Sequence, residues 1–446
     1  MSQATFTAGQ ELSRFRASSR VQAIQRTALA MLVLGGVVNY IDRATLAVAN
    51  PLIRADLGLS IADMGYLLSA FLWAYAFSQL PAGALIDRLG PRRLLSLGLG
   101  LWSLAQFCGG VVTSLTQFFC ARVALGMGEA PQFPTGARVV RDWFNVGQRG
   151  TGTGIFNCAS TLGTAIAAPL LTGLMLTFGW RWMFMIMGAA GIAVAVVWYV
   201  IYRDPGDVAL TEQERHFLTE GDTNGEAERV TFREWQLLFG CRTTWGMILG
   251  FFGTVYITWI YNSWLPGYLE MDRHMSILKT GWTAAIPAVC GVVGAIWGGW
   301  VVDWLVRRGL SPINSRKYPM ALSLLGMAGF TLAAAYVPSN VAAVACISAA
   351  MFLGYVSSST AWAMVSVAAP TNCTASLGSM QNFGGYLGGA LAPTVTGFIV
   401  QATGSFVPAL AVGAGIGVAS AICYFVIIRE PITAVELGNL EGAFAD

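Results

Sequence analysis

Four charged residues stand in stretches of sequence that are otherwise apolar. Asp42 and Arg43 lie in NYIDRATLAVAN, and Arg122 and Glu129 lie in a later apolar stretch. A carboxylate can take up and release a proton, and a guanidinium can bind another carboxylate through two parallel hydrogen bonds. Because a charge in apolar surroundings is costly, all four are candidates for function.

The charges of these four residues sum to zero when both carboxylates are ionised and to +2 when both are protonated. Proton uptake would therefore turn a neutral region into a cationic one that can bind an organic anion. Proton–anion coupling requires a switch of this kind. A structural alternative stays open, in which the four form ion pairs that lock helices together.

Helical spacing places constraints on how these side chains can meet. Arg122 and Glu129 are seven residues apart, which is two turns and about 10.5 Å along a helix axis, so they share a stripe. Asp42 and Arg43 are adjacent and point about 100° apart, so they cannot simply pair. We expect one of them to face a cavity and the other to face a neighbouring helix.

The composition identifies the elements that must position these residues as membrane helices. Of the 446 residues, 55% are hydrophobic and only 11% are charged, compared with about 25% charged in a soluble domain. Runs of about 20 apolar residues predict twelve spans, at roughly 28–50, 64–86, 94–112, 116–139, 151–177, 182–202, 245–267, 280–305, 318–338, 341–368, 374–402 and 406–428.

The predicted fold is all-α, with two pseudo-symmetric bundles of six transmembrane helices. Basic residues in alternate short loops place both termini in the cytoplasm of a multi-pass inner-membrane protein. The predicted units are a basic cytoplasmic tail (1–27), an N-terminal bundle (28–202), a cytoplasmic middle loop (203–243), a C-terminal bundle (244–428) and a second cytoplasmic tail (429–446).

Two pairs of motifs recur at an offset close to half the chain. GALIDRLGPRR at 83–93 is echoed by GWVVDWLVRRG at 299–309, and APLLTG at 168–173 is echoed by APTVTG at 392–397. This offset indicates an internal duplication, and transporters built in this way bind substrate between their halves near the middle of the membrane. From residue 318 to residue 428 there is no Asp, Glu, Lys or Arg, so charge-based chemistry must come from the first half.

Other kinds of site are disfavoured. The eight cysteines have no metal or redox spacing, and the two histidines lie in separate polar segments, so we expect no metal site. No nucleophile–base set or phosphate loop occurs, which disfavours an enzyme with catalytic residues. The middle loop is too short for a sensor domain. We expect no nucleic-acid partner, no cofactor other than a coupling proton, and a monomer in the lipid bilayer.

Twelve spans, a large middle loop and the G-x-x-x-D-R-x-G-x-R-R loop resemble the major facilitator superfamily. The segments NYIDRATLAVA, FLWAYAFSQLPAG, MGEAPQFPTGARVVRDWF and MSILKTGW are similar, more narrowly, to the anion:cation symporter family. The resemblance is to its bacterial sugar-acid branch, the galactonate, glucarate/galactarate and hexuronate transporters, and it runs from about residue 28 to residue 428.

The resemblance implies a role for each charged residue. Asp42 and Glu129 match proton sites, Arg43 matches the arginine that meets the substrate carboxylate, and Arg122 matches a residue that couples proton to substrate. Four further residues match substrate-facing positions: Tyr40, Tyr75, Trp362 and Asn382. Polar in-membrane residues that could also contact a sugar acid are Asn157, Asn262 and Gln381, although Gln381 and Asn382 are neighbours and only one should face a cavity.

At one position the sequence departs from the family pattern. Ser160 stands where galactonate- and glucarate-type relatives carry glutamine, so the pocket is expected to be roomier or differently hydrogen-bonded. Pro131 and Pro134 are expected to loosen the span beside Glu129. The residues predicted to form a conformational latch between inward and outward states are Asp87, Arg88, Arg92 and Asp303.

The predicted function is therefore import of a small organic anion with protons by alternating access. The expected substrate is a sugar acid, which could be an aldonate, an aldarate or a hexuronate. An uncoupled facilitator or exporter of an aromatic or other carboxylate is the alternative, and a membrane enzyme or nutrient sensor is a third, less favoured possibility.

Overall fold

The structure is a computed structural model that describes residues 17–219, 236–368 and 374–432. Within these ranges all regular secondary structure is helical. Most of the two predicted tails and part of the predicted middle loop lie outside the described residues.

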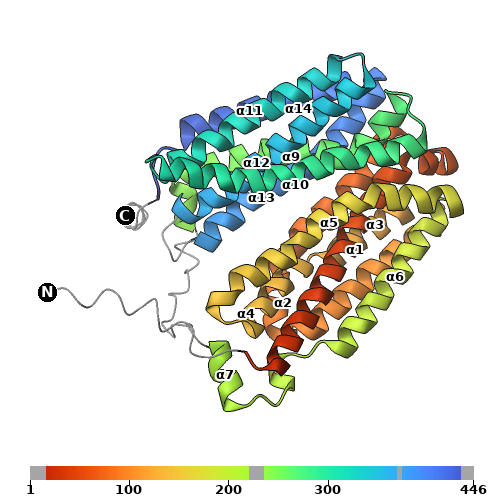
Figure 1. The fold of residues 1–446 in the computed structure, drawn as a ribbon. Coiled ribbons are helices and arrows are strands. Elements are labelled where there is room, and N and C mark those ends of the chain that lie inside the picture. Colours follow the sequence, from red (N-terminus) through yellow and green to blue (C-terminus); the bar gives the residue numbers. More distant parts are fainter. Residues whose placement is uncertain (1–16, 220–235, 369–373, 433–446) are drawn as a thin grey trace.

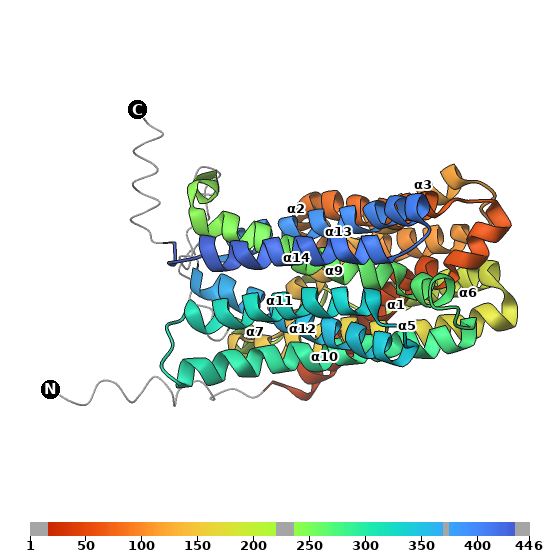
Figure 2. The ribbon, with the colours of Figure 1, turned by 90° about the horizontal axis from the view of Figure 1, so that it is seen from above.

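The long helices lie side by side along the length of the molecule and form two bundles (Figures 1 and 2). The first bundle comprises α1 Ser19–Leu57, α2 Ile61–Gly109, α3 Leu115–Glu129, α4 Gln132–Trp143, α5 Val146–Phe178 and α6 Trp180–Ile201. The connection holds η1 Pro205–Asp207, α7 Glu212–Thr219 and η2 Leu238–Gly240. The second bundle comprises α9 Arg242–Met271, α10 Ile277–Arg307, α11 Asn314–Tyr336, α12 Asn340–Ala368, α13 Thr374–Thr403 and α14 Val407–Ile427.

Ten helical segments in the described residues are long and apolar enough to span a membrane, compared with the twelve spans predicted. The difference arises in the first bundle. The 49-residue helix α2 changes direction at Gly90, whose φ of 76° and ψ of 157° are not helical. Its two arms cover the predicted second and third spans, but only Ile61–Gln79 of the first arm is among the ten segments. The predicted fourth span is interrupted at Ala130 and Pro131, which leaves α3 and α4 with 15 and 12 residues.

The outer surface of both bundles carries large apolar side chains. Trp282 and Ile296 on α10 are 66% and 72% exposed, and Val200 on α6 is 58% exposed. Apolar patches of this kind are rare on soluble monomers but suit contact with lipid. The protein is therefore a multi-pass membrane protein.

The two bundles touch at one end of the helices. Thr394 on α13 lies 2.7 Å, hydroxyl to hydroxyl, from Ser69 on α2, and the Gln401 side chain accepts a hydrogen bond of 2.8 Å from the backbone of Ala62. A Cβ added to Gly65 would lie 2.8 Å from the Pro393 carbonyl oxygen, so only glycine permits this close approach. Toward the other end, where α1 begins and α14 ends, the ribbons diverge (Figure 1).

The repeated sequence motifs fall on the helices that make these contacts. APLLTG lies on α5, which packs against α10 where Thr172 approaches Gly281. APTVTG lies on α13, which packs against α2 where Pro393 approaches Gly65. The repeated aspartate motifs lie on the partner helices α2 and α10. Each half thus contributes two helices to the contact, one that carries the proline motif and one that carries the aspartate motif.

Two hydrophobic clusters hold the bundles together. One lies mainly in the first bundle and includes the fully buried Trp102, Trp143 and Trp198. The other extends across both bundles and joins Met64 of α2 to Trp264 of α9. The contact between the halves is therefore part of a continuous apolar core.

Candidate functional site

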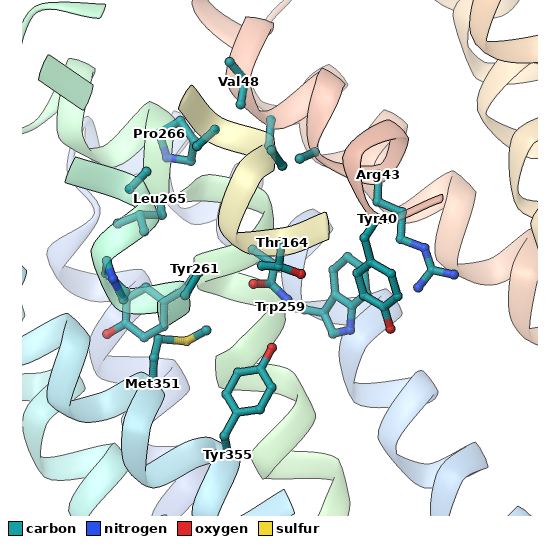
Figure 3. A pocket seen from close by; sticks show the side chains of 18 residues that line it. Tyr40, Arg43, Val48, Thr164, Trp259, Tyr261, Leu265, Pro266, Met351 and Tyr355 are labelled. Atoms are coloured by element: carbon teal, nitrogen blue, oxygen red, sulfur yellow. The ribbon is translucent and has the colours of Figure 1, made fainter. Parts of the chain in front are cut away.

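Two adjoining cavities lie between the bundles, with volumes of about 110 and 220 Å³. The first is lined by residues of α1, α5, α9, α10 and α12, and the second by residues of α1, α9, α12 and α13. Both are lined by Tyr40, Arg43, Trp259, Asn262 and Tyr355. Figure 3 shows Arg43 and Tyr40 on α1, with Tyr355 and Met351 of α12 across the first cavity.

Among the described residues that line these two cavities, Arg43 is the only charged one. Its Nε donates a hydrogen bond of 2.7 Å to Oε2 of Glu129, which is fully buried at the end of α3. Nη2 of Arg43 and Oε1 of Glu129 are buried without a hydrogen-bond partner among the described residues. The pair therefore has unused bonding capacity on both sides.

Aromatic rings surround the Arg43 guanidinium. Its central carbon lies 4.8 Å from the ring centre of Tyr40, 5.1 Å from that of Phe71 and 4.6 Å from that of Tyr75. Cation–π attraction favours a guanidinium over such faces. Tyr75 also contacts Tyr386 of α13 at 5.3 Å between ring centres, so the rings that hold Arg43 extend into the second bundle.

Asp42 and Arg122 are buried and line neither of the two cavities. Asp42 is fully buried, and neither of its carboxylate oxygens has a hydrogen-bond partner among the described residues. Arg122 is 3% exposed, lies over the Phe71 ring at 5.2 Å and has unpartnered Nε and Nη1 atoms. The expectation that Asp42 and Arg43 point in different directions is confirmed.

Helical spacing named no direct partner for any of the four charges. Arg122 and Glu129 both lie on α3, and the observed ion pair joins Glu129 to Arg43 across two helices. Sequence spacing reports only neighbours on one helix, so it could not identify this pair.

Of the polar residues predicted in the second bundle, some line a cavity and others are buried inside the bundle. Asn382 lines the second cavity, whereas the neighbouring Gln381 is fully buried with an unpartnered amide. The expectation that only one of the two faces a cavity is therefore confirmed. Trp362 is 47% exposed and packs edge-to-face on Phe251, which itself lines the second cavity.

Several wall residues were missed by the sequence analysis. On α5, Thr164 lines the first cavity one turn beyond Ser160, and its hydroxyl donates a 2.7 Å hydrogen bond to the Ser160 carbonyl. Asn262 was included among the polar candidates, but Trp259 and Tyr355 were not, because aromatic residues in apolar spans look like packing residues. The side chain of Asn157 lies outside the described residues.

Of the four residues predicted to form a latch, Arg92 has clear contacts in the structure. The backbone N–H of Arg92 donates to Asp204 at 3.4 Å, its Nη1 lies 3.5 Å from Asp207, and its guanidinium covers the Tyr199 ring. Burial raises the pKa of the Asp204 carboxyl above its ordinary value, and the Arg92 hydrogen bond opposes that rise. Arg88 and Asp303 are exposed, and the side chain of Asp87 lies outside the described residues.

Comparison with known proteins gives consistent similarities. A profile described as Major Facilitator Superfamily matches residues 32–393. The chain is 43% identical to a probable L-galactonate transporter of Escherichia coli (strain K12), over 93% of this chain and 92% of that protein. It is 34% identical to a probable galactarate/D-glucarate transporter of Bacillus subtilis (strain 168), over 92% and 93%.

Among solved structures, the fold is similar to that of a bacterial homolog of the human lysosomal transporter Spinster, in an inward-facing and unoccupied conformation. The TM-score is 0.73 at 19% identity, and the match covers 96% of this chain and 98% of that one. At this identity the likeness concerns the fold alone.

Proposed function

This chain belongs to the major facilitator superfamily, as the motifs predicted, and is a transporter; on that premise we propose that it imports a sugar acid together with protons by alternating access. In this proposal the two arms of α2 and the interrupted pair α3–α4 complete twelve spans in the inner membrane. The observation that carries the proposal is the 2.7 Å ion pair between Arg43, on the cavity wall, and the buried Glu129.

The ion pair supplies a mechanism for coupling. A substrate carboxylate and the Glu129 carboxylate compete for the same guanidinium, because each is an anion suited to the Arg43 fork. Protonation of Glu129 removes one competitor and leaves Arg43 free to bind substrate. Loss of that proton toward the cytoplasm restores the competition and expels the substrate.

Asp42 and Arg122 form the second part of the proposed switch. A buried carboxylate without hydrogen-bond partners is costly when ionised, so the Asp42 carboxyl is suited to carry a proton while the substrate is bound. Arg122 lies in the same buried region and makes the surroundings of Asp42 and Glu129 sensitive to each other's charge. The net charge of the four groups then follows their protonation.

The charge of the cavity walls favours a substrate with one carboxylate. Arg43 is the charged residue among the lining residues of both cavities, and the remaining polar groups there are hydroxyls and amides, such as those of Thr164, Asn262 and Asn382. A monoanion with several hydroxyls matches this set. The name of the relative from Escherichia coli, a probable L-galactonate transporter, agrees with an aldonate.

Uptake into proteoliposomes tests the proposal. With the outside made acidic, we expect galactonate to accumulate, and a protonophore to abolish the accumulation. Glu129→Gln should bind galactonate at least as well as the unaltered protein, because Arg43 is free, but should not drive accumulation. Asp42→Asn should also lose accumulation. If both variants still concentrate galactonate, proton coupling through these residues is wrong.

A second candidate function is facilitated transport of an aromatic carboxylate. The aromatic wall of the first cavity favours it, since Tyr40, Trp259, Tyr261 and Tyr355 all line this cavity. The same proteoliposomes distinguish the two functions. An aromatic carboxylate such as benzoate would compete with galactonate, and its movement would not depend on the pH gradient.

A further inference from the structure

A cavity of about 300 Å³ lies apart from the transport site, where the beginning of α1 meets the end of α6. On the α1 side it is lined by Arg20 and by mostly apolar residues that include Ile24 and Met31. The other wall is formed by Ile201, Tyr202, Arg203 and Val208. None of the charged residues proposed for transport takes part in it.

Two arginines give this cavity its charge. Nη1 of Arg20 donates a 2.9 Å hydrogen bond to the carbonyl of Ala209, and Nη1 of Arg203 donates to the carbonyls of Tyr199 and Tyr202. These bonds hold each guanidinium in place and occupy only part of its five N–H donors. The lining residues include no carboxylate.

The nearby acidic residue Glu214 does not neutralise Arg20 by a direct pair. Its carboxylate accepts a 2.6 Å hydrogen bond from Ser18 and a 3.0 Å hydrogen bond from the Thr211 backbone, and no ion pair with Arg20 occurs in the described part of the chain. The Glu214 charge acts on Arg20 without a direct contact. Arg203 likewise has no ion pair in the described part of the chain, so both guanidiniums keep N–H donors for an anion.

The position of the cavity indicates which kind of anion it binds. It lies at the ends of two candidate membrane spans, and the adjoining outer surface is apolar, with Val200, Ile201 and Leu34 58%, 49% and 45% exposed. A ligand that fits must combine an anionic head for the arginines with an apolar tail for this surface.

We propose that this cavity binds the headgroup of an anionic phospholipid, with its phosphate between Arg20 and Arg203 and an acyl chain along the apolar surface of α1 and α6. Basic pockets at the cytoplasmic side of transmembrane helices suit such headgroups, and each basic residue contributes severalfold to the affinity. The bound lipid links α1, which carries Asp42 and Arg43, to the end of the first bundle. The proposal does not depend on which substrate is transported.

Native mass spectrometry of the purified full-length protein tests this, with phosphatidylglycerol and phosphatidylcholine titrated separately. We expect phosphatidylglycerol to bind at least about tenfold more tightly. Arg20→Gln and Arg203→Gln should each weaken its binding about fivefold, and the double variant about thirtyfold. The midpoint of thermal unfolding shows whether each variant remains folded.

Arg26→Gln is the matched control. Arg26 lies on the same helix six residues after Arg20, is exposed and bonds to the Gln22 carbonyl of its own helix, so this change should leave lipid binding unaltered. Equal binding of the two lipids, or equal losses in the control, would overturn the proposal. Displacement of phosphatidylglycerol by millimolar inorganic phosphate would also overturn it, because the site would then be one for soluble phosphate.

Should the double variant prove unstable, Arg20→Lys with Arg203→Lys provides a second test. Lysine keeps the charge, so phosphatidylglycerol should remain preferred over phosphatidylcholine. Loss of that preference in a folded Lys variant would contradict an electrostatic headgroup site.

Discussion

Arg43 connects the ion pair, the aromatic rings and the cavity. Lysine at this position would keep the positive charge but lose the planar fork that pairs with Glu129 and lies against three rings, and arginine and lysine are not equivalent at such sites. We expect Arg43→Lys to raise the KM for galactonate at least about tenfold, equivalent to about 1.4 kcal/mol of binding free energy. Initial rates of proteoliposome uptake over a range of galactonate concentrations measure this.

Arg242→Lys is a suitable control, because Arg242 is an exposed arginine that bonds to the Val426 carbonyl far from both cavities. It should leave the KM unchanged. An Arg43→Lys protein with an unaltered KM would show that Arg43 does not bind the substrate carboxylate.

The number of cations in the cavities leads to a prediction about specificity. A second carboxylate, as in galactarate, would have to leave water without a cationic partner when the site closes, which is unfavourable. We therefore expect galactarate to compete with labelled galactonate at least about tenfold less well than unlabelled galactonate does. Asn382→Lys places a second cation at the second cavity and should narrow that difference, whereas Asn382→Gln should not.

Residue types and family motifs predicted several residues of this candidate site, and for physical reasons they missed others. A charge in an apolar stretch is conspicuous, so Asp42, Arg43, Arg122 and Glu129 could all be found from the sequence. Their partners depend on how separate helices pack, so the Arg43–Glu129 bond could not. Aromatic wall residues such as Trp259 carry no signal that distinguishes a cavity wall from a packed core.

At the scale of elements, hydropathy located the helices well but did not define their ends. It measures the apolar length that a membrane requires, whereas a helix continues until a cap or a break stops it. α1 begins at Ser19, where the Ser18 side chain accepts a hydrogen bond from Val21, nine residues before the predicted span. Conversely, the two helical arms of α2 meet directly at Gly90, within the polar segment that hydropathy would place between two spans.

Gly90 permits the abrupt change of direction between the two arms of α2, and its replacement is predicted to be costly. Its φ of 76° is strained for any residue with a side chain, and an added Cβ would lie 2.8 Å from Oδ2 of Asp204. We expect Gly90→Ala to lower the free energy of unfolding by about 1–2 kcal/mol and to weaken the contacts of Arg92 with Asp204 and Asp207. Thermal unfolding in detergent measures the loss.

Gly100 offers a control on the same helix. It is helical, and an added Cβ meets nothing within 4 Å, so Gly100→Ala should be neutral or stabilising by up to about 1 kcal/mol. If the two alanine variants unfold at the same temperature, the conformation of Gly90 does not hold the two arms of α2 in place.

On the scale of the whole molecule, the contacts between the bundles are gathered at one end. They comprise the approach of α2 to α13, the approach of α5 to α10, and a 3.1 Å contact from Nη1 of Arg54 on α1 to the Met271 sulfur on α9. Helices that diverge from a shared contact can rock about it, and opening that contact would expose the cavities to the other side of the membrane. The proposed alternating access requires a state of this kind, closed at one end of the helices and open at the other.

A reversible covalent link across the contact would test whether it must open. Ser69 and Thr394 are suited to this because their hydroxyl oxygens lie 2.7 Å apart on α2 and α13. With Ser69→Cys and Thr394→Cys combined, we expect an oxidant to form a disulfide and to stop galactonate uptake, because the closed end can no longer open. A reductant should restore uptake.

Each single cysteine variant controls for bonds to the native cysteines and should keep its activity under oxidant. Undiminished uptake by the cross-linked protein would mean that substrate enters without separation of these helices, and the closed end seen here would then not be a gate.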